Sequence, residues 1–145
     1  DTTGYTPEEP IAAIATALAP AALGIVRTSG KGCIDLVATL FSRPQALLSA
    51  QGNTLVYGWI CPPCATAAEK SPASAQKNRI DEVMLSVYRA PRSFTGEDMV
   101  EISCHGGVSV VTAVYNLLLA NGFRAAEHGE FTFRAYINGK TDLTR

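Results

Sequence analysis

The segment from Ser93 to Gly107 constrains the fold of this chain more than any other part of the sequence. It begins as a polar turn around Gly96, continues as an alternating stretch, and ends in a glycine pair that opens an apolar helical pattern. The alternation predicts a strand with Met99, Glu101 and Ser103 on one face and Val100, Ile102 and Cys104 on the other. The carboxylate of Glu101 is therefore expected midway along a strand, beside a glycine-rich turn, where it could bind a polar ligand.

Short strands and helices follow one another irregularly along the rest of the chain. Strands are predicted over 11–16, 23–28, 53–60, 82–90 and 123–126, and helices over 33–41, 110–118 and 130–138. Ser29 and Gly30 are expected to cap the first helix, and Pro44 to lie just beyond its end. This order has no strict strand–helix–strand repeat. It predicts a single α+β domain over 1–145, with a mixed β-sheet and helices packed against one face.

Composition limits the classes of function that fit this chain. Hydrophobic residues make up 47% of the 145 residues and charged residues 17%, which is typical of a globular domain. The formal net charge of −1 disfavours a domain that binds nucleic acid phosphates by itself. No apolar run approaches the roughly 18 residues of a membrane span, so a cytoplasmic protein without a membrane partner is expected. Residues 62–78, rich in Ala, Ser, Pro and Lys, are predicted to be a loop insertion.

Motifs for common reaction chemistry are absent from the sequence. A P-loop needs G-x-x-x-x-G-K-[ST], of which Gly139-Lys140-Thr141 supplies only the end, and no dinucleotide fingerprint or nucleophile elbow occurs. Cys61 and Cys64 have the spacing of half a zinc site or a redox pair, but no second pair follows, so we interpret them as reduced loop thiols. His105 and His128 each adjoin a glycine and are interpreted as turn residues. We therefore predict no catalytic residue and no metal site.

Several charged residues within or near the predicted elements remain as candidates for ligand binding: Arg27, Glu101, Arg134, Lys140 and Asp142. The sequence alone identifies them only as surface candidates. A ligand with neighbouring N–H donors would be bound by a carboxylate, and a ligand with an acidic tail by an arginine or a lysine.

Four segments of the chain, taken in series, resemble one known family. They are Ile11–Thr16, Gly24–Gly30, Ser93–Gly107 and Gly129–Leu143, and they contain the phrases Ser-Phe-Thr-Gly-Glu-Asp, His-Gly-Gly, Gly-Glu-Phe and Asn-Gly-Lys. Together they are similar to the N-terminal domain of the tRNA-modifying GTPase family MnmE, also called TrmE. The resemblance runs from about residue 11 to the end of the chain.

The resemblance implies a folate-binding domain that forms a homodimer, with a fold similar to the folate-binding domain of aminomethyltransferases. The implied cofactor is a tetrahydrofolate derivative (5-formyl- or 5,10-methylene-tetrahydrofolate), and the family's folate-binding residues fall on Arg27, Glu101 and Lys140. A pterin ring presents an amino group and a ring N–H side by side, and the carboxylate of Glu101 can accept both. Arg27 and Lys140 suit carbonyl or glutamyl carboxylate oxygens.

The resemblance also places this domain within a larger protein. In the family, a helical domain with an inserted G domain follows and binds GTP, magnesium and potassium. The whole protein works with an MnmG-type partner on the wobble uridine of tRNA, where the folate supplies the one-carbon unit of a carboxymethylaminomethyl-type group. The chain begins without methionine and stops where the helical domain would start, so we expect a fragment without GTPase activity of its own.

Three features depart from the family pattern, one of which is the loop 62–78, longer than is typical of the family. The glycine-rich loop that usually precedes the strand at Gly24 is alanine-rich here, at 17–23, and Cys104 takes a position that is commonly glycine before His105. Alanine does not readily adopt a positive φ, which limits close approach of a ligand to the backbone of that loop. Two further hypotheses stay open, the second of them motivated by this alanine-rich loop. One is a folate-dependent aminomethyl- or formyl-transferase domain, and the other is a dimerisation module without folate binding.

Overall fold

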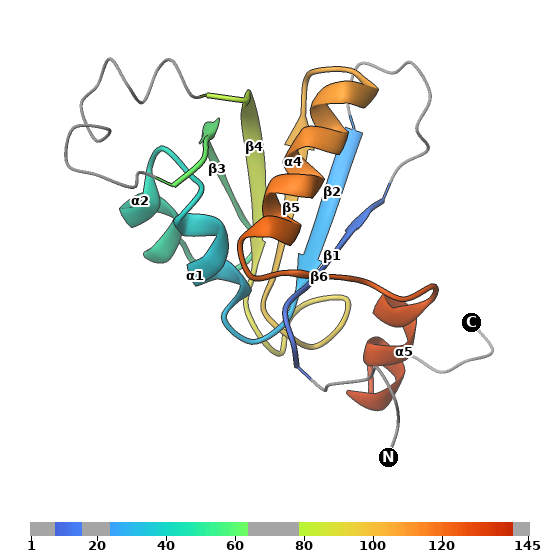
Figure 1. Ribbon diagram of the computed structural model, residues 1–145. Helices are drawn as coiled ribbons and strands as arrows, with labels where there is room; N and C mark the ends of the chain where they lie inside the picture. The colour runs from blue at the N-terminus through green and yellow to red at the C-terminus, as the bar shows by residue number, and fades with distance from the viewer. Residues whose placement is uncertain (1–7, 16–23, 64–78, 141–145) are drawn as a thin grey trace.

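Six strands form one sheet in the order β3-β4-β5-β2-β1-β6 (Figure 1). The computed structural model describes residues 8–15, 24–63 and 79–140. Its strands are β1 (Ile11–Ile14), β2 (Gly24–Ser29), β3 (Thr54–Ile60), β4 (Asp81–Tyr88), β5 (Met99–Cys104) and β6 (Arg124–Ala125), and its helices are α1 (Cys33–Ala38), α2 (Pro44–Leu48), α4 (Val108–Ala120) and α5 (Glu130–Ile137). Neighbouring strands are antiparallel except for β1 and β6, which pair in parallel. The predicted α+β class with a mixed sheet is confirmed.

Helices α1, α2 and α4 lie on one face of the sheet, and the core lies beneath them. Helix α4 packs on β1 and β2, while α1 packs on β5 and on α2 (Figure 1). Every second residue of β4, namely Val83, Leu85 and Val87, is fully buried in this layer, so the alternation of the strand decides which of its sides meets the core. Gly24 allows β2 to approach α4, because a Cβ at that position would overlap the side chain of Val111.

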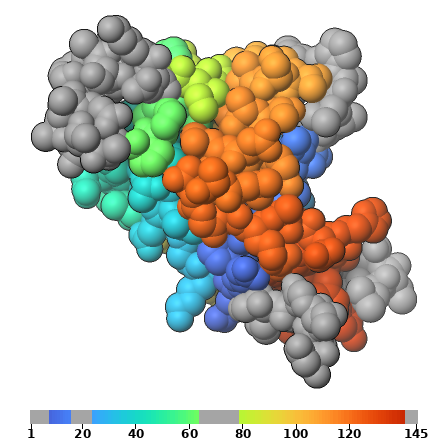
Figure 2. All heavy atoms as spheres, in the orientation of Figure 1, coloured from blue at the N-terminus to red at the C-terminus, as the bar shows by residue number. Residues whose placement is uncertain are grey.

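The opposite face of the sheet, called the open face below, carries the other half of each alternating strand. On β3, Leu55 and Tyr57 are 55% and 56% exposed there. On β5, by contrast, Met99 and Ser103 are buried on this face as well. Helix α5 lies apart from the other helices, below β6 in the view of Figure 1, and the space-filling view in Figure 2 shows it projecting from the body of the molecule.

The start of the first helix differs from the prediction. Ser29 belongs to β2, and the residue before the helix is Gly32, in the left-handed conformation (φ 82°) and without a side-chain cap. Ser29 Oγ donates to Glu97 Oε1 at 2.7 Å and shares a hydrogen bond of 2.7 Å with Thr95 Oγ1. A carboxylate is a stronger acceptor than any partner at a helix start, but it reaches Ser29 only after distant segments have come together.

Helix α1 is shorter than predicted, and a second helix follows it. α1 ends at Ala38, and Phe41 forms an isolated bridge with Ile60 instead of continuing the helix. Pro44 is the first residue of α2, where the N–H that proline lacks would have no partner within the helix anyway. Pro44 thus begins helix α2, whereas the sequence pattern indicated only that the first helix ends before it.

The remaining predicted elements lie where they were expected, with ends shifted by a few residues. The prediction for 11–16 can be compared only up to residue 15, and its strand ends at Ile14. The alanine-rich loop 17–23 and most of the predicted insertion 62–78 fall outside the described residues, as do Cys64 and Asp142. Over the described ranges, no helix is both long enough and apolar enough to cross a membrane.

The burial pattern of the core can be tested with two leucines. Replacing the fully buried Leu85 by Ala should lower the free energy of unfolding by about 2–5 kcal/mol, because it leaves a cavity between sheet and helices. The same change at Leu48, which is 37% exposed at the end of α2, should cost less than about 1 kcal/mol. Urea unfolding followed by circular dichroism measures both. Equal losses would contradict the assignment of this face of β4 to the core.

Candidate functional site

Arg27 of β2 and Glu101 of β5 form an ion pair on the open face. The two residues are direct partners in the antiparallel register, so their side chains leave the same side of the sheet. Arg27 Nε donates to Glu101 Oε2 at 2.8 Å, and the side chains are 32% and 22% exposed. Within the described residues, neither Nη atom of the arginine nor Oε1 of the glutamate has a hydrogen-bond partner. Unused donors and an unused acceptor therefore lie side by side.

The ion pair has small side chains beside it on the adjacent strands and two aromatic rings next to its guanidinium. Ala13 of β1 is the register partner of the arginine, and Ser86 of β4 that of the glutamate. The guanidinium carbon of the arginine lies 5.5 Å from the ring centroid of Phe94 and 5.7 Å from that of Phe131. Phe94 comes from the connection between β4 and β5, and Phe131 from the first turn of α5. Both rings are placed for cation–π contact with the guanidinium.

Lys140, the third predicted folate contact, follows α5 and packs against the connection between β4 and β5, not against the ion pair. Its Nζ donates to the carbonyl oxygen of Pro91 at 2.9 Å, and its aliphatic stem lies close to Gly96. Gly96 has a φ of 83°, and a Cβ on it would come within 2.9 Å of Asn138 Cβ, so only glycine fits between the connection and the end of α5. In the described part of the chain, no hydrogen bond joins this lysine to the ion pair. The structure thus brings two of the three predicted residues into contact.

The expectation that Arg134 is a surface residue is wrong, because its side chain has no exposure to solvent. Its Nη1 lies 3.0 Å from Glu97 Oε1 and donates to the carbonyl oxygen of Glu9 at 2.8 Å, and its Nη2 lies 3.0 Å from Glu130 Oε2. A buried guanidinium is tolerated only where carboxylates balance its charge. Glu97 lies 37 positions away in the sequence, so no local pattern revealed this pairing.

Glu130 connects this buried arginine to a second, partly exposed arginine. Arg124 of β6 donates to both carboxylate oxygens of Glu130, at 3.0 and 2.6 Å, and to Glu9 Oε1 at 2.8 Å. Burial alone would raise the pKa of Glu130, but hydrogen bonds from Arg124 and from the backbone N–H of Glu127, together with the charge of Arg134, outweigh burial. The pKa of Glu130 is therefore lowered from its ordinary 4.5, and α5 is tied to β6 and to the N-terminal segment.

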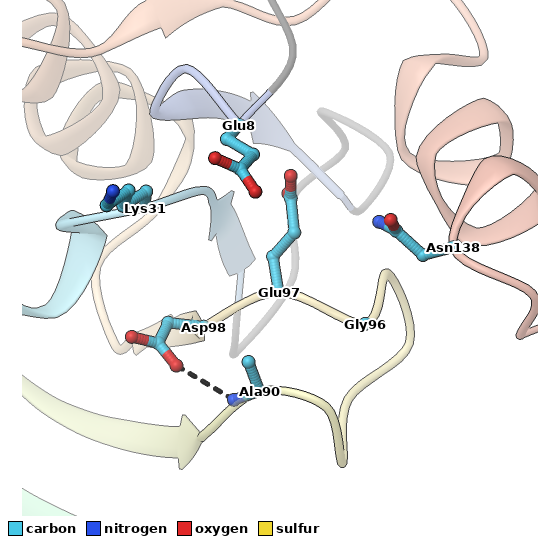
Figure 3. A pocket seen from close by; sticks show the side chains of 7 residues that line it. All are labelled: Glu8, Lys31, Ala90, Gly96, Glu97, Asp98 and Asn138. Carbon is cyan, nitrogen blue, oxygen red and sulfur yellow. Dashed lines mark hydrogen bonds between the residues drawn. The ribbon is translucent and has the colours of Figure 1, made fainter.

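A polar hollow of about 170 Å³ lies next to this network (Figure 3). It is lined by the N-terminal segment, the residues before α1, the connection between β4 and β5, and the end of α5: Glu8, Lys31, Ala90, Gly96, Glu97, Asp98 and Asn138. Figure 3 shows Glu8 and Glu97 reaching into it from two sides, while Asp98 accepts a hydrogen bond from the N–H of Ala90 at 2.8 Å. With more carboxylates than cations, the hollow does not suit an anion, and neither member of the ion pair on the open face lines it.

The contacts of the buried thiols and of His105 indicate structural roles and not catalytic ones. Burial raises the pKa of Cys33 and of Cys104 to about 12, so both remain protonated at neutral pH and are poor nucleophiles. The backbone N–H of His105 donates to Asp81 Oδ2 at 2.7 Å, and its ring Nδ1 lies 2.8 Å from the carbonyl oxygen of Glu82, which places it in the turn between β5 and α4. Over residues 8–15, 24–63 and 79–140, no group of three His, Cys, Asp or Glu side chains could hold a metal ion.

Reasoning from the sequence missed the two aromatic rings beside Arg27. Phe94 and Phe131 stand in the phrases Ser-Phe-Thr-Gly-Glu-Asp and Gly-Glu-Phe, which carry the family resemblance, so their segments were identified. The rings themselves gave no signal, because single exposed aromatic residues are common on protein surfaces. Only the packing of α5 against the connection between β4 and β5 shows that both rings contact one guanidinium.

Comparisons with known sequences relate this chain to one family. The family model described as GTP-binding protein TrmE N-terminus matches residues 10–140. A tRNA modification GTPase MnmE of Treponema denticola is 58% identical over 141 residues, and one of Treponema pallidum is 57% identical, each over 97% of this chain. The protein of that name from Carboxydothermus hydrogenoformans is 46% identical over 140 residues. The chain spans 28%, 26% and 28% of the lengths of these three relatives.

Acid should weaken the network through Glu130. Its pKa is lower in the folded chain than in the unfolded chain, so its contribution to stability is fully present above about pH 4.5 and is lost as the pH falls through the folded pKa. We expect Glu130→Gln to reduce the free energy of unfolding at pH 7 by about 1–3 kcal/mol and to flatten its decline in acid. The matched control is Glu127→Gln, because the side chain of Glu127 is exposed. Chemical unfolding over a pH series measures both, and an unchanged acid slope for Glu130→Gln would contradict this role.

Proposed function

This chain belongs to the family of TrmE N-terminal domains, and on that premise we propose that it is the folate-binding domain of a tRNA modification GTPase. The relatives named above are tRNA modification GTPases, and their similarity extends over 95–97% of the chain. The proposed ligand is a tetrahydrofolate derivative, 5-formyl- or 5,10-methylene-tetrahydrofolate, held on the open face of the sheet. The observation that carries this proposal is the partly exposed ion pair of Arg27 and Glu101.

The pair offers the groups that a reduced pterin ring requires. The ring presents an amino group and a ring N–H as adjacent donors, with a carbonyl acceptor next to them. Oε1 of Glu101 is unused, and Oε2 keeps a second lone pair beside its bond from Arg27, so one carboxylate can accept both donors. The Nη atoms of Arg27 can donate to the carbonyl. An acceptor and donors on adjacent strands thus complement one edge of the ring.

The small contribution of this pair to stability also supports a ligand-binding role. Partly exposed ion pairs contribute about 0–1 kcal/mol to folding, and β2 and β5 are already joined along six register positions. The charged side chains are therefore not needed to hold the two strands together. Their hydrogen bonds strengthen when a bound ring replaces the surrounding water, because the local dielectric constant falls.

Lys140 is proposed to bind the acidic end of the folate. Its side chain is exposed, and its Nζ is bonded to the carbonyl oxygen of Pro91. Exchanging that neutral acceptor for a glutamyl carboxylate would replace an ordinary hydrogen bond by a charge-assisted one. The lysine stands beside the connection that carries Phe94, so the ligand would run from the ion pair past this connection toward the end of α5.

In the whole protein, we propose that this domain holds the one-carbon donor for a modification of the wobble uridine of tRNA, in the cytoplasm. The modification requires an MnmG-type partner protein and a G domain that binds GTP, magnesium and potassium. We assign the GTPase reaction to that G domain and the binding of the folate to this one.

We further propose that the domain forms a homodimer that uses the open face of β3. Leu55 and Tyr57 are more than half exposed on this edge strand. The guanidinium carbon of Arg79 lies over the ring of the neighbouring Trp59, 4.7 Å from the centroid of that ring. Adjacent large apolar side chains on one exposed strand are typical of a protein interface. A second copy of this chain is the occupant that the family resemblance implies.

Folate binding can be tested by calorimetry with 5-formyltetrahydrofolate. Glu101→Gln should weaken binding about tenfold or more, because the amide loses the charge and presents an N–H where the pterin presents one too. Glu82 is an exposed residue of β4 on the same open face of the sheet, so the Glu82→Gln variant should bind folate as the wild type does. A folded wild-type chain that binds no folate would contradict the proposal, and selective loss in the Glu82 variant would contradict the assignment of Glu101.

The dimer can be tested by sedimentation equilibrium. The wild-type chain should show twice the mass of the monomer, and Leu55→Asp should raise the dimer dissociation constant about tenfold or more by burying an unpaired charge in the interface. Leu48→Asp places the same charge on a leucine of α2, on the other side of the sheet, and should leave the dimer intact. A wild-type monomer at all concentrations, or equal weakening by both variants, would contradict the proposed interface.

A further inference from the structure

Two aromatic rings flank the guanidinium of Arg27, and they come from segments far apart in the sequence. The guanidinium carbon lies 5.5 Å from the ring centroid of Phe94 and 5.7 Å from that of Phe131. Phe94 is 47% exposed, although it is large and apolar. A half-exposed ring next to a guanidinium with unused Nη donors forms a surface that suits a flat, polar ligand ring.

A buried ion pair holds the two ring-bearing segments together. On α5, Arg134 Nη1 lies 3.0 and 3.3 Å from the two carboxylate oxygens of Glu97 in the connection between β4 and β5. A second link joins the same segments, because Asn138 Nδ2 donates to the carbonyl oxygen of Thr95 at 2.8 Å. Each ring stands three positions before its own segment's half of the ion pair. The contacts that join the segments therefore also set the positions of the rings.

The ion pair is in turn anchored to the strand that carries Arg27. Ser29 Oγ donates to Glu97 Oε1 at 2.7 Å and shares a hydrogen bond with Thr95 Oγ1, also at 2.7 Å. Ser29 and Arg27 are two positions apart on β2, so both side chains leave the open face. Strand β2 thus carries the guanidinium of Arg27, and its last residue, Ser29, also holds Glu97, whose ion pair with Arg134 positions both rings.

We propose that Phe94 and Phe131 form an aromatic wall of the folate site, and that Arg134 is the positioning residue that sets both rings against Arg27. This inference rests on the proposed folate binding and extends it to the pterin ring, which contacts the wall while its polar edge meets the ion pair. The rings restrict the rotamers of Arg27 and shield its hydrogen bonds from water. Its Nη donors are therefore ordered before the ligand arrives, which reduces the entropy lost on binding.

The wall is tested by calorimetry with two ligands, 5-formyltetrahydrofolate and p-aminobenzoylglutamate, which lacks the pterin. Phe94→Leu and Phe131→Leu keep most of the apolar volume but remove the rings, and each should weaken binding of the folate about tenfold. Neither change should alter the weaker binding of p-aminobenzoylglutamate. Phe133→Leu is the matched control, because that ring is 42% exposed on the same helix and should leave both affinities unchanged.

The positioning role needs a readout that a general loss of structure would not produce. Arg134→Gln removes the arginine partner of Glu97 and leaves Glu130 with Arg124 alone, which endangers folding. Asn138→Ala, which removes the milder link, is therefore measured beside it, with thermal melts as a check on folding. If the link acts through the rings, Asn138→Ala should weaken folate binding about threefold to fivefold in the wild type and hardly at all in Phe131→Leu. Equal weakening in both backgrounds would overturn the positioning role.

The outcomes separate this inference from the proposed function. A wild type that binds 5-formyltetrahydrofolate together with ring variants that bind it equally well overturns the aromatic wall and leaves folate binding in place. A folded wild type that binds no folate overturns the proposed function, and this inference with it. Loss of folate binding in Phe133→Leu as large as in Phe131→Leu also overturns the wall, since it would reflect damage to α5.

Discussion

A guanidinium without access to water, that of Arg134, holds α5 and the N-terminal segment against the end of the sheet. Glu97 and Glu130 balance its charge, and Arg124 extends the network to β6. Removing one member of a buried ion pair typically costs about 3–5 kcal/mol, because its partner keeps an unpaired charge away from water. That is a large part of the roughly 5–15 kcal/mol that stabilises a domain, so the segments that meet here have one favoured arrangement.

The ion pair of Arg27 and Glu101 differs from this network in its surroundings and in what it can do. It is partly open to water, lies between two small side chains, and keeps hydrogen-bonding groups unused. The buried network differs in that its carboxylates are shielded from water and are already bonded to arginine side chains. The buried network thus provides rigidity and the open pair provides recognition, and both depend on β2, which carries Arg27 and Ser29 on one face.

Local patterns predicted most of the fold because they report on burial within one element. Alternation identified β4 and β5, and helical periodicity identified α4 and α5, since one face of each must meet the core. The errors fall where a residue serves a partner distant in the sequence. Ser29 resembled a helix cap but bonds Glu97, and Arg134 resembled a surface residue but is buried between carboxylates. Both residues contact Glu97, which lies outside any local window around either of them.

By itself, the sequence determined the α+β class and the order of the main elements, because these follow from periodicity along the chain, and the family resemblance selected Arg27, Glu101 and Lys140 among the charged candidates. Only the tertiary structure decided how they meet. The register of β2 against β5 sets Arg27 opposite Glu101, and Lys140 instead reaches the carbonyl oxygen of Pro91. The buried charges of α5 bring the two phenylalanine rings to one guanidinium. Such contacts depend on distances between segments that are far apart in the sequence, and spacing along one chain does not contain those distances.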